Sequence, residues 1–144
     1  MTIQTIMTAD PLALRDNDTV SHAENALLAK GFINLPVIDG QSRYLGMFGV
    51  FELLAELTPR SSADDAGADL PELRRRLKEV RTKVVGPLVN KTLPVLHPDS
   101  SIGAALRQFH QHRCSLPVVD QANGRLRGIV SYWDALGAVT TTPK

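Results

Sequence analysis

An internal repeat constrains the fold more than any other feature of the sequence. The segment LPVID at residues 35–39 recurs as LPVVD at residues 116–120. The glycine of the next apolar segment recurs as well, as Gly46 and Gly128, at almost the same interval. Because a repeated segment folds as one recurring supersecondary unit, the sequence predicts two similar halves.

The repeat divides the chain into four parts. We expect residues 1–57 to form the first repeat and residues 85–139 to form the second. Residues 58–84 are an insert, a loop followed by a charged helix, and residues 140–144 are a short tail. With 144 residues, 43% of them hydrophobic and 22% charged, the chain is long enough to bury a sizeable core. Disorder and a collagen-like structure are therefore not expected.

Each repeat has the pattern of a β-α-β-β-α unit. In the first repeat the apolar residues Val20 and Leu27 share one face of a helix that Gly31 can end. The short apolar runs at 35–38 and 116–119 contain β-branched residues, as strands buried on both faces do. Asp-Gly and Asn-Gly dipeptides after these runs predict hairpin turns into second strands.

The expected elements follow from these patterns. Strands are expected at 12–14, 35–38, 44–48, 94–96, 116–119 and 126–130, and helices are expected to begin near 19, 49, 100 and 131. A three-stranded sheet with helices on one side leaves apolar surface that it cannot bury alone. The fold class is therefore α/β (α+β), with the two repeats packed about a pseudo-twofold axis.

The insert predicts a further helix. Asp69 as N-cap, Pro71 in the first turn and Glu72 as capping-box partner start it, and it runs to about Lys83. Its apolar stripe is Leu70, Leu73, Leu77 and Val80, and its basic residues are Arg74, Arg75, Arg76, Lys78, Arg81 and Lys83. Either the helix presents a basic patch to a phosphate-bearing or acidic partner, or it is a solvated helix whose stripe packs on the core or on a dimer mate.

Charge and cysteine content argue against several classes of function. A formal net charge of +1 does not hold a phosphate backbone by charge alone, so nucleic acid is not the expected partner. Cys114, the single cysteine, excludes an intramolecular disulfide and suits a reducing cytoplasm. The first twenty residues lack the pattern of a secretory signal, and no apolar run approaches the ~20 residues of a membrane span. We expect a cytoplasmic protein that does not insert directly into a membrane.

The sequence also lacks recognisable catalytic or metal-binding motifs. His110 and His112 are two residues apart on a predicted helix and face different ways, unlike the i, i+4 pair of a helical metal site. No paired carboxylates, Ser-His-Asp arrangement or phosphate-binding P-loop is present. We expect no metal site and no enzymatic activity.

The order, spacing and duplication of these motifs resemble a tandem pair of cystathionine-β-synthase (CBS) domains, called a Bateman module. The resemblance covers nearly the whole chain apart from the insert and the tail. It implies a regulatory module, either stand-alone or part of a larger enzyme, transporter or channel, without catalytic activity of its own. It further implies that AMP, ADP, ATP or S-adenosylmethionine binds in a cleft between the repeats, with NADH as another candidate and no required cofactor.

The second repeat satisfies the ligand signature of this family, Gly-x-x-Ser/Thr-x-x-Asp, with Gly128, Ser131 and Asp134. The glycine permits close backbone approach, the serine lies at the mouth of a helix, and the carboxylate can accept bonds from ribose hydroxyls. The same Ser–Asp spacing is also that of a capping box, which needs no ligand. The resemblance favours the nucleotide site.

The first repeat departs from this signature. Its corresponding residues are Gly46, Gly49 and Glu52, so the hydroxyl is missing and the acid is one methylene longer. We therefore expect the cleft beside Glu52 to be weak, empty or altered, and the cleft beside Asp134 to be the working one.

The resemblance implies four more residues for the cleft beside Asp134: Asp18, Thr19 and Ala23 of the first repeat, and Ser115 of the second. Some family members carry a basic residue at the position of Ser115, where it neutralises phosphate. Because Ser115 cannot do this, AMP or an adenosine-like ligand is favoured over a triphosphate.

Three functions follow from the sequence. The first is an adenine-nucleotide sensor that regulates an enzyme or transporter which the sequence does not identify. The second is a ligand-free interaction or dimerisation module, and the third, less favoured, is a nucleic-acid-associated protein that uses the basic helix. A homodimer is expected because the closing helices carry the apolar residues Phe51, Leu53, Leu54, Tyr132, Trp133 and Leu136.

Overall fold

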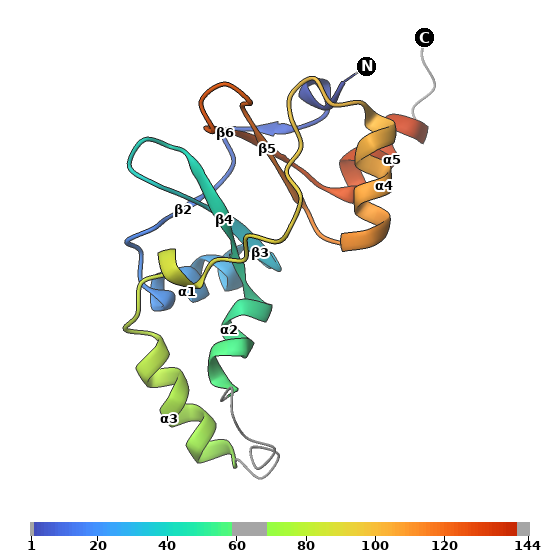
Figure 1. The fold of residues 1–144 in the computed structure, drawn as a ribbon. Helices are drawn as coiled ribbons and strands as arrows, with labels where there is room; N and C mark the ends of the chain where they lie inside the picture. The colour runs from blue at the N-terminus through green and yellow to red at the C-terminus, as the bar shows by residue number, and fades with distance from the viewer. Residues whose placement is uncertain (1, 59–68, 141–144) are drawn as a thin grey trace.

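Two three-stranded sheets, each flanked by helices, form the fold (Figure 1). The structure is a computed structural model, and it describes residues 2–58 and 69–140. The strand order is β2-β3-β4 in one sheet and β1-β6-β5 in the other. Most of the loop expected at 58–67, and the tail after residue 140, lie outside the described residues.

The first sheet and its helices follow the expected β-α-β-β-α order. The elements are β2 (Leu14–Arg15), α1 (Val20–Lys30), β3 (Asn34–Ile38), β4 (Tyr44–Gly49) and α2 (Val50–Leu57). The Thr19 side chain caps α1 by accepting a hydrogen bond from the backbone N–H of His22. Gly31 ends α1 in the left-handed conformation, at φ 66°, which glycine adopts without steric cost.

The second half repeats this order with one difference. Its elements are α4 (Ile102–His112), β5 (Leu116–Val119), β6 (Leu126–Val130) and α5 (Tyr132–Thr140); the short helix η3 (Gly86–Leu88) precedes them in the chain but packs on the first half. The strand expected at 94–96 is reduced to a single bridge, in which Leu96 lies parallel to Val118. Ser101 caps α4, since its side chain accepts a hydrogen bond from the backbone N–H of Ala104.

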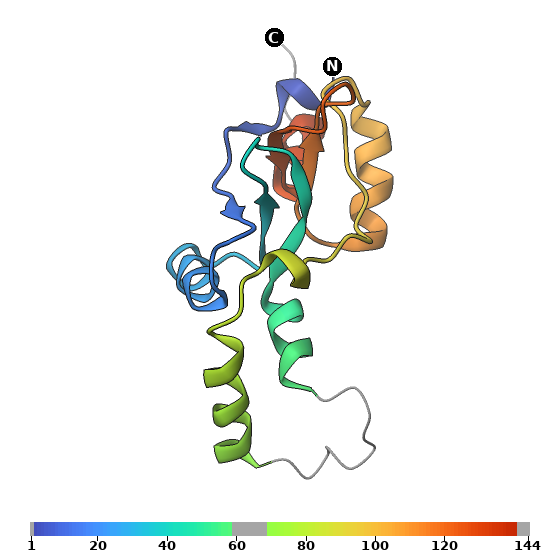
Figure 2. The ribbon, with the colours of Figure 1, turned by 60° about the vertical axis from the view of Figure 1, so that its left-hand side comes forward.

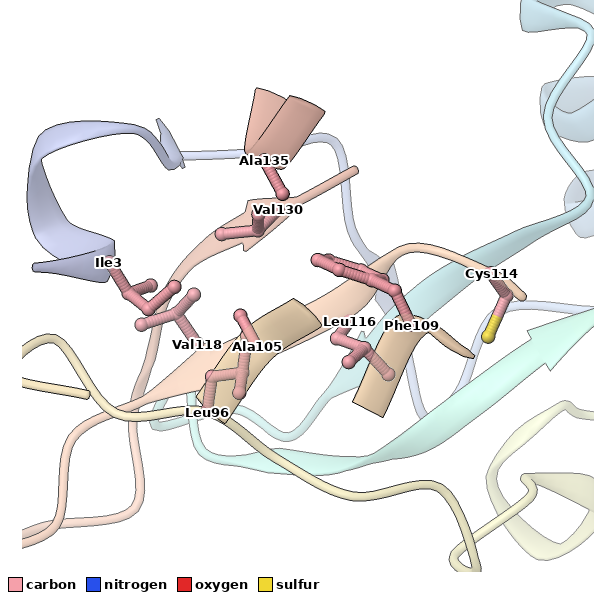
Figure 3. Packing of buried hydrophobic residues seen from close by; sticks show 9 residues of the cluster. All are labelled: Ile3, Leu96, Ala105, Phe109, Cys114, Leu116, Val118, Val130 and Ala135. Atoms are coloured by element: carbon pink, nitrogen blue, oxygen red, sulfur yellow. The ribbon is translucent and has the colours of Figure 1, made fainter. Parts of the chain in front are cut away.

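The N-terminal residues pack on the second half rather than on the first. The short helix η1 (Ile3–Thr5) places Ile3 in the second hydrophobic core, where its side chain is fully buried (Figure 3). β1 (Thr8–Ala9) pairs antiparallel with β6, with Thr8 opposite Ile129. In Figure 1, β1 accordingly lies beside β6, although the two strands are far apart in the sequence.

The segment before the second repeat, residues 85–90, packs in turn on the first half. Val85 is fully buried in the first core, and Asn90 forms a β-bridge with Met47 of β4. In the register of the repeat that aligns Gly46 with Gly128, Val85 corresponds to Ile3 and Asn90 corresponds to Thr8. Each half of the fold is therefore completed by a segment that precedes the other repeat's own strands.

Backbone hydrogen bonds between the two hairpins show the pseudo-twofold symmetry directly. The N–H of Tyr44 donates to the carbonyl of Gly124, and the N–H of Leu126 donates to the carbonyl of Ser42, each at 2.9 Å. Tyr44 corresponds to Leu126 in the repeat, and Ser42 corresponds to Gly124, so the two bonds are the same bond with the halves exchanged. The axis therefore passes between the two hairpins, which confirms the expected packing.

Glycine recurs at positions 46 and 128 because a segment from the other repeat lies directly against each of them. A Cβ on Gly128 would lie 2.7 Å from the carbonyl oxygen of Thr8 and 2.7 Å from the sulfur of Met7. A Cβ on Gly46 would lie 2.8 Å from the carbonyl oxygen of Asn90. These distances are shorter than any real side chain tolerates, so both positions need glycine because another backbone lies directly against them.

Each half has its own hydrophobic core. Full burial of a large aliphatic or aromatic side chain stabilises the folded state by roughly 1.5–3 kcal/mol. The first core contains Leu14, Val20, Ala23, Leu27, Leu35, Val37, Phe48, Val80 and Val85. The second contains Ile3, Leu96, Ala105, Phe109, Cys114, Leu116, Val118, Val130 and Ala135 (Figure 3). No helix within residues 2–58 and 69–140 is long and apolar enough to cross a membrane.

The helix of the insert, α3 (Leu70–Val80), packs beside α2 at one end of the molecule (Figures 1 and 2). Asp69 caps it as expected, accepting a hydrogen bond from the N–H of Glu72, and it ends before Lys83. Its stripe ends in Val80, which is buried in the first core. The Val80 end of the stripe therefore packs on the core, as the solvated-helix interpretation expects, while Leu70 at the other end is 56% exposed.

Two neighbouring arginines of α3 should differ in their effect on stability. Arg75 is 57% exposed and pairs with Glu72 and Glu79 on its own helix. Arg76 is only 19% exposed, and its guanidinium donates to the backbone carbonyl of Leu57 at the end of α2. We expect Arg76→Glu to lower the free energy of unfolding by about 1–3 kcal/mol, because it leaves a partly buried carbonyl unpaired beside a new anion.

The matched substitution Arg75→Glu should have a clearly smaller effect, since only exposed pairs within one helix are lost. Urea denaturation of both variants measures the difference. Equal losses would show that the contact between α2 and α3 does not depend on Arg76.

Candidate ligand-binding clefts

Two clefts lie between the halves, and they differ in size. The larger has a volume of about 580 Å³ and the smaller about 180 Å³. The larger is lined by Thr8, Pro11, Leu12, Lys30, Gly31, Phe32, Ile33, Asn34, Leu35, Cys114, Ser115, Ile129, Ser131, Tyr132, Trp133 and Asp134. The smaller is lined by Ile33, Asn34, Phe51, Glu52, Asn90, Leu93, His112, Arg113 and Cys114. The two sets are largely related by the repeat, so these are two versions of one site.

Ser131 and Asp134 lie together at the mouth of the larger cleft and form a capping box. The backbone N–H of Asp134 donates to Ser131 Oγ at 3.1 Å, and the backbone N–H of Ser131 donates to Asp134 Oδ2 at 2.9 Å. Among the described residues, Asp134 Oδ1 has no hydrogen-bond partner. The cap thus holds the carboxylate of a cleft-lining residue in place and uses only one of its oxygens, so capping does not exclude binding.

Of the other residues expected at this site, Ser115 lines the larger cleft and Gly128 does not. Gly128 instead lies against Met7 and Thr8 of the N-terminal segment. Because Thr8 itself lines the cleft, Gly128 contributes indirectly by allowing Thr8 to lie there.

The structure does not bring Asp18, Thr19 and Ala23 together with Asp134. Ala23 is fully buried in the first core, Thr19 caps α1, and Asp18 accepts a hydrogen bond from the backbone N–H of Arg15. All three lie at the N-terminal end of α1, whereas the larger cleft is lined by the other end of this helix. A helix of 11 residues separates its ends by about 16 Å.

Sequence reasoning missed the residues that follow α1. Lys30, Phe32 and Ile33 line the larger cleft, and Lys30 is the only cationic side chain among the lining residues. The signal was present, because these residues precede the first LPV segment just as Cys114 and Ser115 precede the second. The two segments that precede the LPV motifs therefore face the same cleft from opposite repeats.

In the smaller cleft Glu52 takes the place of Asp134. Burial raises the pKa of the Glu52 carboxyl, while weaker hydrogen bonds from the Asn90 side chain and the backbone of Gly49 act in the opposite direction. Burial also raises the pKa of the Cys114 thiol, which lies in the wall shared by both clefts. A thiol with a raised pKa is a poor nucleophile, so Cys114 has the environment of a packing residue.

The described residues contain no group of three or more His, Cys, Asp or Glu side chains that could hold a metal ion. His112 lines the smaller cleft. His97 is occupied structurally, since its Nδ1 lies 2.9 Å from the carbonyl oxygen of Val119.

The fold and the clefts define a class of protein: two α+β repeats related by a pseudo-twofold axis, with a pair of related clefts between them. The sequence model of the CBS domain matches residues 3–58 and residues 77–141. The chain therefore belongs to the CBS domain family and contains two copies of the domain.

Solved structures agree with this assignment. CBSX2 from Arabidopsis thaliana is 26% identical with a TM-score of 0.76, over 96% of this chain and 93% of that chain. A structure of CBSX2 in complex with AMP is 27% identical with a TM-score of 0.73, over 96% of this chain and 95% of that chain. CbpB in complex with c-di-AMP, at 17% identity and a TM-score of 0.74, covers 96% of this chain and 84% of that chain and shows the fold alone. Among curated proteins, none matches the sequence.

Proposed function

We propose that this protein is a regulatory module that binds an adenine nucleotide of the AMP class in its larger cleft. The observation that carries the proposal is the position of Asp134. Its carboxylate is fixed by the capping box, keeps one oxygen for a ligand, and lies in a cleft of about 580 Å³ between apolar walls. Such a combination of apolar walls and a few fixed polar groups is typical of small-molecule sites.

The lining residues match the three parts of a nucleotide. The apolar side chains of Leu12, Phe32 and Ile33 suit the base, and the Asp134 carboxylate suits the ribose hydroxyls. The ammonium of Lys30 and the first backbone N–H groups of α5 suit a phosphate. The structure of CBSX2 with AMP, a relative at 27% identity, supports the same ligand class.

Charge favours one phosphate over three. Lys30 is the only cation among the lining residues, and Asp134 is the only anion. A triphosphate would bring several negative charges into a cleft whose lining residues carry no net charge, and unpaired charges are costly to desolvate. We therefore expect AMP to bind at least as tightly as ADP and ATP.

Calorimetry and thermal shift with AMP, ADP, ATP, S-adenosylmethionine and NADH test the proposal. We expect one dominant site per chain and the strongest stabilisation by AMP. A ligand regulates by binding one of two conformations more tightly, so the response of a partner enzyme or transporter requires such a difference. If no member of this panel binds, the ligand-free interaction module becomes the better description.

The exposed apolar residues of the two closing helices support a homodimer. Phe51 of α2 is 67% exposed, and Trp133 of α5 is 69% exposed. The exposed apolar residues of the two helices are Val50, Phe51, Leu54, Tyr132, Trp133, Leu136 and Val139. Exposed apolar surface gathered on two helices usually marks an interface.

Light scattering tests the homodimer. We expect twice the chain mass of 15.7 kDa at micromolar concentration, and the chain mass itself for a variant with Leu54→Glu and Leu136→Glu. Neither leucine lines a cleft, so nucleotide binding does not confuse the result. Leu28→Glu is the control, because Leu28 is 74% exposed and belongs to α1 rather than to either closing helix. A wild-type mass of 15.7 kDa would contradict the dimer.

A further inference from the structure

The two repeats differ at the residue that comes directly before the closing helix. This residue is Gly49 in the first repeat and Ser131 in the second. In the first repeat, the pairing of β3 with β4 continues as far as Asn34 opposite Gly49. In the second repeat, the pairing of β5 with β6 stops one residue earlier, at Leu116 opposite Val130. The second hairpin is therefore one residue pair shorter at the end that borders the larger cleft.

This difference changes the start of the helix that follows. In the first repeat the backbone N–H of Val50, the first residue of α2, donates to the carbonyl of Ile33 at 2.9 Å. The counterparts in the second repeat are Tyr132 and Cys114. Within residues 2–58 and 69–140, the N–H of Tyr132 has no hydrogen-bond acceptor. The first N–H of α2 is thus bonded to the chain's own backbone, whereas the first N–H of α5 has no such partner among the described residues.

The cause is the space that one Cβ atom needs. A Cβ on Gly49 would lie 2.6 Å from the Cα of Asn34 and still closer to the carbonyl oxygen of Ile33. The φ of Gly49 is −164°, which is extended backbone that any residue adopts, so glycine is needed here for space alone. Ser131 carries this Cβ, and the segment before β5 cannot take the same position against it.

We propose that Ser131 is a positioning residue whose Cβ, rather than its hydroxyl, holds the larger cleft open. The Cβ keeps the carbonyl of Cys114 away from α5, which leaves the N–H of Tyr132 free for a ligand and leaves the cleft at about 580 Å³. In the equivalent cleft beside Gly49, the carbonyl of Ile33 accepts the first N–H of α2, and the cleft measures about 180 Å³. The ligand named in the test rests on the proposed function, but the opening of the cleft does not.

Two variants separate the Cβ from the hydroxyl without any ligand. Ser131→Ala keeps the Cβ and removes the hydroxyl, whereas Ser131→Gly removes both. Amide hydrogen exchange of Tyr132, followed by NMR, reports whether its N–H is bonded. We expect fast exchange in the wild type and in Ser131→Ala, and exchange slower by about tenfold or more in Ser131→Gly, where the carbonyl of Cys114 closes on it. Equal exchange rates in the two variants would overturn the proposal.

Affinity and stability should rank the two variants in opposite orders. We expect the dissociation constant for AMP to be about tenfold or more higher in Ser131→Gly than in Ser131→Ala, because a closed cleft loses contacts on both walls. We expect Ser131→Ala to be the less stable of the two, since alanine is a poorer N-cap than glycine. If the loss of affinity came from general destabilisation, the less stable variant, Ser131→Ala, would also be the one that binds AMP more weakly.

Equal losses of AMP affinity in both variants would assign the role to the hydroxyl and overturn the proposal. Unchanged affinity in Ser131→Gly would overturn it as well. If the wild type binds no AMP, the proposed function fails, while the exchange of the Tyr132 amide still decides whether Ser131 holds the cleft open.

Discussion

Replacing Asp134 by alanine should abolish the stabilisation of this protein by AMP. AMP at about 100 times its dissociation constant is expected to stabilise the native wild type by about 2.7 kcal/mol, which raises the melting temperature by several degrees. The Asp134 carboxylate is the only anionic acceptor among the residues of the larger cleft. Each charge-assisted bond to a ribose hydroxyl is worth about 1.5–3 kcal/mol, so the loss of the bonds to both hydroxyls exceeds the stabilisation of about 2.7 kcal/mol.

The capping box complicates this variant, because Asp134 Oδ2 also accepts the N–H of Ser131. Asp134→Ala should therefore cost about 1 kcal/mol without ligand, and the shift must be measured from each variant's own baseline. Asp134→Asn is the matched variant. It keeps an oxygen for the cap and loses the charge, so its unliganded melting temperature should stay near that of the wild type while the AMP shift falls.

Glu52→Ala is the control for the choice of cleft. Glu52 lines the smaller cleft, and its removal should leave most of the AMP shift intact. Two equal sites per chain in calorimetry, or binding that is lost only with Glu52, would show that the working cleft has been assigned to the wrong repeat.

Replacing Gly49 by serine should destabilise the fold rather than restore the missing family signature. The new Cβ would lie 2.6 Å from the Cα and the Cβ of Asn34 and against the carbonyl of Ile33, so backbone must move. Overpacking of this kind costs about 1–3 kcal/mol, and here the hydrogen bond from Val50 to Ile33 is lost in addition. Urea denaturation measures the loss.

Gly103→Ser is the matched control for this substitution. Gly103 lies in the first turn of α4, and a Cβ there would have no atom within 4 Å. Serine has a higher helix propensity than glycine, so this variant should be as stable as the wild type or slightly more stable. If Gly49→Ser were equally harmless, the carbonyl of Ile33 would not be the obstacle that we infer.

Much of the fold could be predicted because it depends on interactions between near neighbours in sequence. Helices were expected to begin near residues 19 and 100, and Thr19 caps α1 and Ser101 caps α4; Gly31 ends α1, as expected, in the left-handed conformation. Caps, hairpin turns and helical spacing act over a few residues, so their signals are visible in the sequence itself. The strand at 94–96 is the exception, because its extent depends on a partner far along the chain.

The candidate site could be predicted only in part. Ser131 and Asp134 were identified because their spacing of three residues is itself local chemistry, and the structure shows them bonded to each other. Lys30 and Phe32 were missed because nothing in their own neighbourhood marks them as cleft residues. They reach the cleft only because the fold brings the end of α1 and the start of α5 to the same cleft.

The sequence by itself determined the duplication, the order of elements within each repeat and the pseudo-twofold relation between them. Only the tertiary structure decided that Ile3 and Val85 each complete the core of the other half, and that one cleft is about three times as large as the other. The physical reason is the range of the interactions. Hydrogen-bonded caps and turns join residues a few positions apart, whereas core burial and the clash at Gly49 join surfaces whose meeting depends on the whole fold.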